Sequence, residues 1–299
     1  MGRIAEALKR AQEERLRKRE AAQGAAREGA PDAGARATEA PASRFGAIFD
    51  LPAMPRPFVV SAPPLPPESV DRRLVSFHEP SLVVSEKYRA IRTRLLTANP
   101  DGSSRIYAVA SSLHGEGRSV SAGNLGFCFA ELRHLRVAVV DCDLRRRGLS
   151  GLFSAADKPG LADVIRGDRP LSEVCLPVVR GNLHLIPSGD PGGESPSDLF
   201  GGSRLASIFQ EIRERFHYAL VDTPPMDTFA DIGLVAPLCH STLVVIRLNS
   251  TPEGVLRRCV RMLQANRISI AGSILVGECQ NGLARPESSD YYNPLAAEA

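Results

Sequence analysis

The sequence predicts an α/β fold with a mostly parallel, doubly wound sheet and helices on both faces. Short apolar runs of strand length alternate with helix-length segments from about residue 82 to residue 276. The connections between them are short, which favours parallel strands joined by crossover helices. Two of the strands end on acidic residues, and ligands of open α/β sheets bind at the carboxyl ends of strands. We therefore expect one α/β domain with a binding site along one edge of its sheet.

The expected elements alternate along the chain. Strands are expected at residues 106–110, 136–140, 183–187, 218–222, 241–247 and 270–276. Helices are expected at residues 83–96, from about 118, and at 161–167, 205–216 and 252–265, with another helix start at Pro196-Ser197-Asp198. Ser85 is the expected N-cap of the first of these helices.

Four segments make up the expected domain organisation. They are an amphipathic N-terminal helix (1–28), a disordered Pro- and Ala-rich linker (29–80), the α/β domain (81–283) and a tyrosine-bearing tail (284–299). The first helix has a narrow apolar stripe, so docking on a partner or membrane surface and simple solvation both remain open. No apolar run approaches the ~18 residues needed to span a bilayer, and the charged start is unlike a secretory signal. We expect a cytoplasmic protein.

Composition excludes some classes of function. The 37 basic residues are offset by 34 acidic ones, and a formal charge of +3 does not indicate nucleic-acid binding. The six cysteines are widely spaced, form no CxxC pair and mostly lie in apolar runs. We interpret them as reduced and buried rather than as disulfides or metal ligands.

A glycine-bearing turn between the strand at 106–110 and the next helix predicts a phosphate site. Gly115 and Gly117 allow backbone conformations closed to other residues, so several N–H groups can face one anion at the positive end of the helix. Gly117 and Ser119 match the P-loop pattern G-x-x-x-x-G-K-[ST], whereas Ser112 replaces its first Gly and Arg118 replaces its Lys. The match is therefore partial.

Acidic residues end two of the expected strands. Asp141 and Asp143 fall at the end of the strand 136–140, and Asp222 ends the strand 218–222, where it is followed by Thr223-Pro224-Pro225. In P-loop proteins an acid at such a strand end holds magnesium, usually through water. Phosphate and metal ligands should thus converge at one edge of the sheet.

Two charged groups have plain structural interpretations. Glu86, Arg89 and Arg92 recur at three-residue steps on one helix face, which is typical of a salt-bridged surface helix. The run Arg145–Arg147 is interpreted as a solvated basic loop. Tyr291 and Tyr292 lie in the polar tail, where a kinase could reach them.

Taken together, these motifs resemble those of the bacterial tyrosine kinases (BY-kinases). Residues 111–125 are similar to their SSxPGEGKSTxxxNL stretch, residues 137–145 to LLIDxDLR, and residues 221–225 to IDTPP. Glu86, Arg89 and Arg92 match their ExxRxxR oligomerisation motif. Residues 189–199 resemble a degenerate form of the family's G-x-x-PPNPxELL segment. The N-terminal residues MGRIAEALKRAQEER resemble N-termini seen on polysaccharide-export members. The resemblance covers about residues 82–283.

The resemblance implies an autokinase that binds Mg-ATP and phosphorylates tyrosines in the tail of a neighbouring subunit, here Tyr291 and Tyr292. The cofactor site would comprise Gly115, Glu116, Gly117, Arg118, Ser119 and Val120. Ser119, Asp143 and Asp222 would hold Mg2+. Asp141 would take the tyrosine proton or position the hydroxyl. The other two catalytic candidates are Arg118, which would stand in for the phosphate-binding Lys, and Asp143, which would support the metal.

The same resemblance implies partners. Rings of the protein would assemble and disassemble to regulate chain length or export of an extracellular polysaccharide. An integral-membrane polysaccharide co-polymerase of the Wzz type would activate it and recruit it to the inner face of the plasma membrane. Three positions depart from the family pattern: Arg118 replaces Lys, His114 replaces Pro, and Val276 stands where Asn is frequent.

Other functions remain as alternatives. A degenerate, non-catalytic member would act as an adaptor in the same machinery. A partition or division-site (MinD/ParA-like) ATPase would carry a second lysine early in the turn, where this chain has Leu113. A dinucleotide-binding domain would need a third glycine where Val120 stands.

Overall fold

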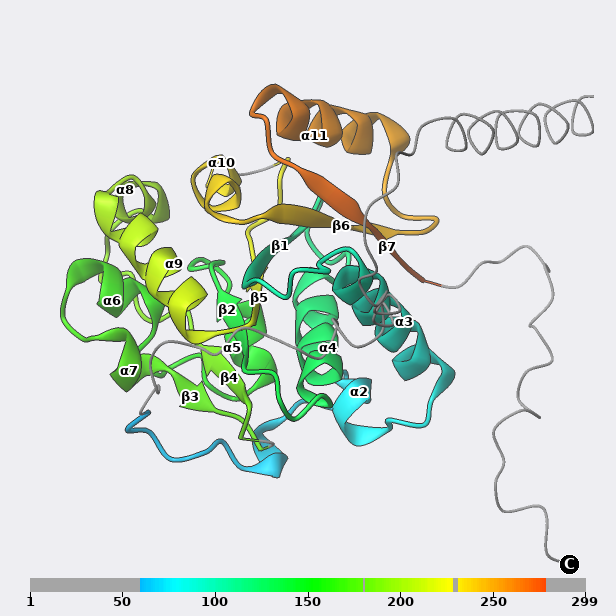
Figure 1. Ribbon diagram of the computed structural model, residues 1–299. Helices are drawn as coiled ribbons and strands as arrows, with labels where there is room; N and C mark the ends of the chain where they lie inside the picture. The colour runs from blue at the N-terminus through cyan, green and yellow to red at the C-terminus, as the bar shows by residue number, and fades with distance from the viewer. Residues whose placement is uncertain (1–59, 180, 228–230, 278–299) are drawn as a thin grey trace, which may run out of the picture. The chain divides into compact units, whose positions relative to one another are not determined.

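The computed structural model describes residues 60–179, 181–227 and 231–277. The expected N-terminal helix (1–28), the first part of the expected linker, and the tail with Tyr291 and Tyr292 lie outside the described residues. Within them the expected fold class is confirmed: a seven-stranded sheet has the order β3-β4-β2-β5-β1-β6-β7 (Figure 1). Every neighbouring pair is parallel except β3 and β4.

The strands are β1 (Arg105–Ser111), β2 (Val137–Asp141), β3 (Leu176–Pro177), β4 (Leu183–Ile186), β5 (Tyr218–Asp222), β6 (Ser241–Arg247) and β7 (Ile270–Val276). The α-helices are α2 (Val75–His78), α3 (Val83–Thr97), α4 (Arg118–Ala130), α5 (Gly148–Leu152), α6 (Leu161–Arg166), α7 (Leu171–Val174), α8 (Pro196–Phe200), α9 (Ser203–Arg215), α10 (Ile232–Val235) and α11 (Glu253–Ala265). Two short 3-10 helices are η2 (Pro67–Ser69) and η3 (Ala236–Leu238).

Alternating side chains of the central strands fill two core layers. On β1, Tyr107 and Val109 pack in the layer that contains α2 to α5, while Ile106 packs on the opposite face with α6 to α9. Ala108 and Ala110, which point to the same face as Ile106, pack with α10 and α11. Because successive side chains of a strand point to opposite faces, continuous apolar strands are covered by helices on both sides (Figure 1).

Residues 60–80 are not a linker, which corrects the expected boundary of the domain. Leu65, Val70 and Leu74 are buried, and the Leu65 N–H donates to the Pro177 carbonyl over 2.7 Å. Leu74 fits against α4 so closely that a Cβ on Gly123 would lie 2.6 Å from its Cδ2. This segment brings α2 onto α4.

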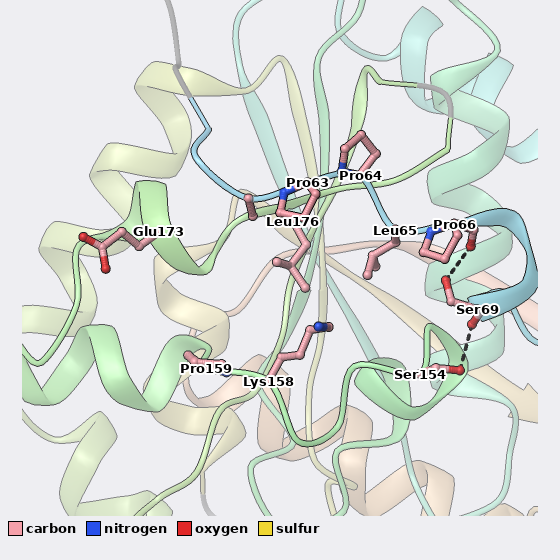
Figure 2. A pocket seen from close by; sticks show the side chains of 11 residues that line it. Pro63, Pro64, Leu65, Pro66, Ser69, Ser154, Lys158, Pro159, Glu173 and Leu176 are labelled. Atoms are coloured by element: carbon pink, nitrogen blue, oxygen red, sulfur yellow. Dashed lines mark hydrogen bonds between the residues drawn. The ribbon is translucent and has the colours of Figure 1, made fainter.

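Figure 2 shows how the proline-rich stretch lies along the sheet edge next to Leu176. The Ser154 hydroxyl donates to the Ser69 carbonyl over 3.1 Å and ties this stretch to the chain after α5. A cavity of about 420 Å³ remains beside it, lined in part by Pro63, Leu65 and Lys158.

Local details differ from expectation at α3. The helix begins at Val83, and the Ser85 hydroxyl donates to the Glu79 carbonyl over 2.9 Å instead of capping the helix. All five described cysteines are free thiols, and four of them are buried. Among the described helices, none is both long enough and apolar enough to cross a membrane.

The packing of residues 60–80 predicts that Leu74→Ala destabilises the domain. Leu74 is fully buried, so truncation should lower the free energy of unfolding by about 2–5 kcal/mol, through lost burial and a residual cavity. Leu82→Ala is the matched control because that side chain is 40% exposed, and its effect should stay within about 0.5 kcal/mol. Urea unfolding measures both. If Leu74→Ala and Leu82→Ala lowered the free energy of unfolding by the same small amount, residues 60–80 would not belong to the core.

Candidate functional site

The turn between β1 and α4 has the backbone geometry of a phosphate cradle. Gly115 and Gly117 adopt φ values of 81° and 93°, in the left-handed region that favours glycine. Gly117 also lies against β7, since a Cβ there would meet Cγ1 of Val276 at 3.4 Å. Helix α4 begins at Arg118, as expected. Backbone N–H groups therefore gather at the positive end of a buried helix.

Three side-chain contacts hold the turn in place. The buried Glu116 carboxylate accepts the Leu113 N–H at 3.1 Å and the Thr251 hydroxyl at 2.5 Å. Arg247 at the end of β6 donates to the Gly115 carbonyl over 2.9 Å. The cradle is thus tied to the loop between β6 and α11. The side chain of Glu116, a residue expected in the cofactor site, shapes the turn.

The predicted acids meet because β2 and β5 are neighbours in register. Asp141 pairs with Asp222 in the ladder, and both side chains are fully buried. Asp141 Oδ1 accepts the Asp143 N–H at 3.0 Å. Its Oδ2 accepts the N–H and the hydroxyl of Ser150, at 2.8 and 2.7 Å. Asp141 therefore fixes the loop after β2 and the start of α5.

Two buried carboxyl groups side by side share their titration. Burial, and then the charge of Asp222, raises the pKa of Asp141 to about 7. Burial also raises the pKa of Asp222, against the opposing charge of Arg118 and the Ser119 hydroxyl. Arg118 contacts Asp222, whereas no guanidinium of the described residues contacts Asp141, so the negative charge is better compensated at Asp222.

Arg118 turns inward and bridges the acids. Its Nε donates to Asp222 Oδ1 over 2.7 Å, and its Nη2 donates to Asp143 Oδ2 over 2.9 Å. A third donor, Nη1, lies 3.2 Å from the Ser111 hydroxyl. The side chain is only 6% exposed. In this structure the guanidinium therefore binds carboxylates at the base of the site instead of extending along the cradle.

An open cavity of about 370 Å³ lies in front of the cradle. Its lining consists of Arg73, Ser111, His114, Gly115, Gly117, Arg118, Ser119, Val120, Asp143, Arg146, Gly148, Leu152 and Arg247. Asp141 and Asp222 lie beneath it and do not line it. The expectation that Asp141 faces the reacting hydroxyl therefore does not match its position. Of the three acids, Asp143 is the one whose side chain lines the cavity.

Three arginines that line this cavity, Arg73, Arg146 and Arg247, were not predicted from the sequence. Arg73 precedes α2, in the segment assigned to a linker, so no local signal marked it. Arg146 falls in the run interpreted as a solvated loop; it lies 3.0 Å from His114 Nε2 across the cavity mouth. Its place directly after an acid-ended strand could have indicated a ligand contact. Of its neighbours, Arg145 pairs with Asp231 and Arg147 with Asp190.

The candidate ligand atoms at this site are of the kind that Mg2+ prefers. Ser119 and the acids Asp143 and Asp222 offer only oxygen, as magnesium prefers. Asp222 Oδ2 has no hydrogen bond of ordinary geometry within the described residues. However, Arg118 occupies one oxygen of each acid, and no group of three or more His, Cys, Asp or Glu forms a ready metal site in the described chain. The residues therefore fit the ion once the guanidinium moves.

The charged face of α3 is built into the domain. Arg89 and Arg92 are 21% and 14% exposed and both bind Glu131, the residue directly after α4, at 2.6 and 2.8 Å. Arg92 also donates to the Cys128 carbonyl over 2.7 Å. Only Glu86, 55% exposed and paired with Arg89, projects outward. The interpretation as a salt-bridged helix is confirmed, with the main partner at the end of another helix.

The fold and the glycine turn between β1 and α4 are of the P-loop type. No family model matches the chain. The chain is 23% identical over 72% of its length to CapB of Staphylococcus aureus, provisionally named a tyrosine-protein kinase, and covers 91% of it. It is 25% identical over 62% of its length to the succinoglycan biosynthesis transport protein ExoP of Rhizobium meliloti, of which it spans 24%. EpsB of Ralstonia solanacearum is likewise matched over only 25% of its length.

A solved structure agrees in fold. The kinase domain of the Escherichia coli tyrosine kinase ETK superposes with a TM-score of 0.65 at 24% identity, over 70% of this chain and 81% of that domain. The chain is thus a homologue of the bacterial tyrosine kinases, and the resemblance drawn from its motifs is confirmed.

The cavity predicts that Arg146→Gln weakens nucleotide binding. Loss of one charge-assisted contact to a phosphate should raise the Kd for ADP about 5- to 10-fold. Arg169→Gln removes the same charge from a side chain that pairs with Glu173 outside the cavity, and it should leave the Kd unchanged. Isothermal titration calorimetry compares the two variants. Equal Kd values for both would contradict a phosphate contact at Arg146.

The pairing of α3 with α4 predicts a pH-dependent effect of Glu131→Gln. Burial raises the pKa of Glu131, but its bonds with Arg89 and Arg92 outweigh this and hold it below the ordinary 4.5. Its stabilisation is therefore complete above about pH 4.5 and is lost as the pH falls through the lowered pKa. The variant should lose about 1–2 kcal/mol at neutral pH and converge with the wild type in acid.

Urea titrations at several pH values measure this difference. Glu253→Gln is the control because Glu253 pairs with Arg257 on the surface and is 74% exposed. A Glu131→Gln difference that stays constant from neutral to acid pH would show that the ion pairs do not cause it.

Proposed function

We propose that the protein is an Mg-ATP-dependent tyrosine autokinase of a polysaccharide biosynthesis and export machinery. The observation that carries the proposal is the cavity in which a left-handed glycine turn, several arginines and Asp143 come together, next to the buried acids Asp141 and Asp222 at two adjacent strand ends. The proposal is supported by relatives named as tyrosine kinases and by ExoP, which is named for succinoglycan biosynthesis.

The cradle would bind the phosphates of ATP. Backbone N–H groups of Gly115 and Gly117 and the start of α4 would bind the inner phosphates. Arg73 and Arg146 at the mouth would neutralise the outer ones. Ser119, Asp143 and Asp222 would hold Mg2+, which supplies charge neutralisation on the transferred phosphoryl group. Catalysis would then rest on positioning and charge stabilisation.

Asp143 would receive the proton of the tyrosine hydroxyl. It lines the cavity, whereas Asp141 is buried behind it and accepts its backbone N–H. We therefore assign Asp141 to positioning the loop that carries Asp143. The tyrosines Tyr291 and Tyr292 of a neighbouring subunit would be the acceptors.

Assembly and location complete the proposal. Rings would form through the α3 face, where Glu86 is the outward-facing member of its motif. An integral-membrane co-polymerase of the Wzz type would recruit the cytoplasmic protein to the inner face of the membrane and activate it.

A non-catalytic adaptor in the same machinery is the second candidate. It is favoured by one observation: Arg118, in place of the P-loop lysine, is bound to both acids. A guanidinium is a planar fork, so two carboxylates hold it more firmly than they would hold an ammonium.

The two candidates differ in tail phosphorylation. Incubation of the purified protein with Mg-ATP and a membrane-partner fragment should add phosphate to Tyr291 or Tyr292, detected by mass spectrometry. Tyr291→Phe with Tyr292→Phe should abolish it. Glu86→Arg should reduce it, because transfer between subunits needs assembly, and sizing chromatography should show smaller particles.

The controls separate the outcomes. Asp143→Asn should remove the phosphate while the fold is retained. Bound ATP without any tail phosphate in the wild type would overturn the autokinase and leave the adaptor. Wild-type activity in Asp143→Asn would refute the role given to that residue.

A further inference from the structure

Arg118 has a second role that its contacts define. Its guanidinium is buried and donates to one oxygen each of Asp143 and Asp222, two of the three groups expected to hold a metal ion. We propose that Arg118 is a built-in counter-ion of these acids, so that a divalent cation binds only after a nucleotide has drawn the guanidinium away. This inference rests on the proposed nucleotide site.

The geometry makes the cation and the guanidinium competitors. Asp222 is fully buried and Asp143 is 2% exposed, so their charges need a cation close by. Nε and Nη2 of one planar group reach both at 2.7 and 2.9 Å. A divalent ion bound by the same two carboxylates would be repelled by the guanidinium charge beside it. The two cations therefore compete for these acids.

A bound nucleotide can end the competition between the guanidinium and the cation because Arg118 belongs to the cradle. Arg118 is the first residue of α4 and directly follows Gly117. Its side chain lies at the base of the site and also lines the cavity. Phosphate oxygens offer a guanidinium a bidentate partner equal to a carboxylate. A polyphosphate in the cradle would therefore attract Arg118 and free Asp143 and Asp222 for the ion that accompanies it.

One oxygen remains ready for this exchange. Asp222 Oδ2 has no hydrogen bond within the described residues, and Ser119 lines the cavity in front of the cradle. Both can contact the ion as soon as Arg118 has moved. The order of events is then nucleotide first, metal with it, and no metal alone.

Manganese alone is the probe. MnCl2 titrations without nucleotide, followed by electron paramagnetic resonance of the free ion, should show weak binding to the wild type. Arg118→Met removes the guanidinium at similar volume and should bind Mn2+ at least about tenfold more tightly. Adding Asp222→Asn to that variant should cancel the gain, which locates the ion.

A second variant covers the case in which Arg118→Met does not fold. Arg118→Lys keeps a positive charge but offers a point donor rather than a fork, so it should leave one acid free and bind Mn2+ with intermediate affinity. Mn2+ should raise the unfolding temperature of either folded variant and leave the wild type unchanged.

Opposite results overturn the inference. Equal Mn2+ affinity in the wild type and the Arg118 variants would show that the guanidinium does not compete. A gain that survives Asp222→Asn would place the ion elsewhere. Neither result depends on kinase activity, so loss of tail phosphorylation would refute the proposed function and leave the Mn2+ result standing.

Discussion

The bridge from Arg118 to Asp143 and Asp222 is the contact on which the site depends. In-register pairing of β2 with β5 forces acids of two strands into one buried volume. Two ionised carboxylates there would repel each other and lose their water, at a cost of several kcal/mol each. A guanidinium from the start of α4 reaches Asp222 and also Asp143, which follows β2, and it is itself desolvated only because these two acids are present. Sheet register and side-chain chemistry thus require one another.

The shape of the cradle does not depend on that bridge. Glu116, Arg247 and Thr251 hold the turn from the side of β6, and Val276 supports Gly117 from β7. A change from lysine to arginine at position 118 therefore alters the charge distribution at the base of the site and leaves the backbone able to receive phosphate. The scaffold of a nucleotide site and the control of its cation are separable properties of this fold.

Much of the domain could be predicted from local patterns. Apolar runs predicted β1, β2, β4, β5 and β6 to within a residue or two, because buried parallel strands are apolar on both faces. The edge strand β7 was predicted as well, although most of its residues are exposed. The start of α4 followed from Gly117, and the acids followed from their places at strand ends. The antiparallel pair of β3 with β4 involves only Leu176 and Pro177, too few residues to leave a pattern.

What could not be predicted are contacts between distant segments. Leu65 and Leu74 stand among prolines and charges, so composition indicated a linker, although each fills a place in the core. That error also hid Arg73. Likewise nothing in the sequence connects Glu131 with Arg89 and Arg92, yet its ion pairs with both arginines hold them in the contact between α3 and α4. Prediction is limited in the same way within a motif. The sequence shows that position 118 is an arginine, but the direction of its side chain depends on acids that lie 25 and 104 residues away in the chain. Motifs therefore identify the participants of such a site, and the sheet decides which of them are partners.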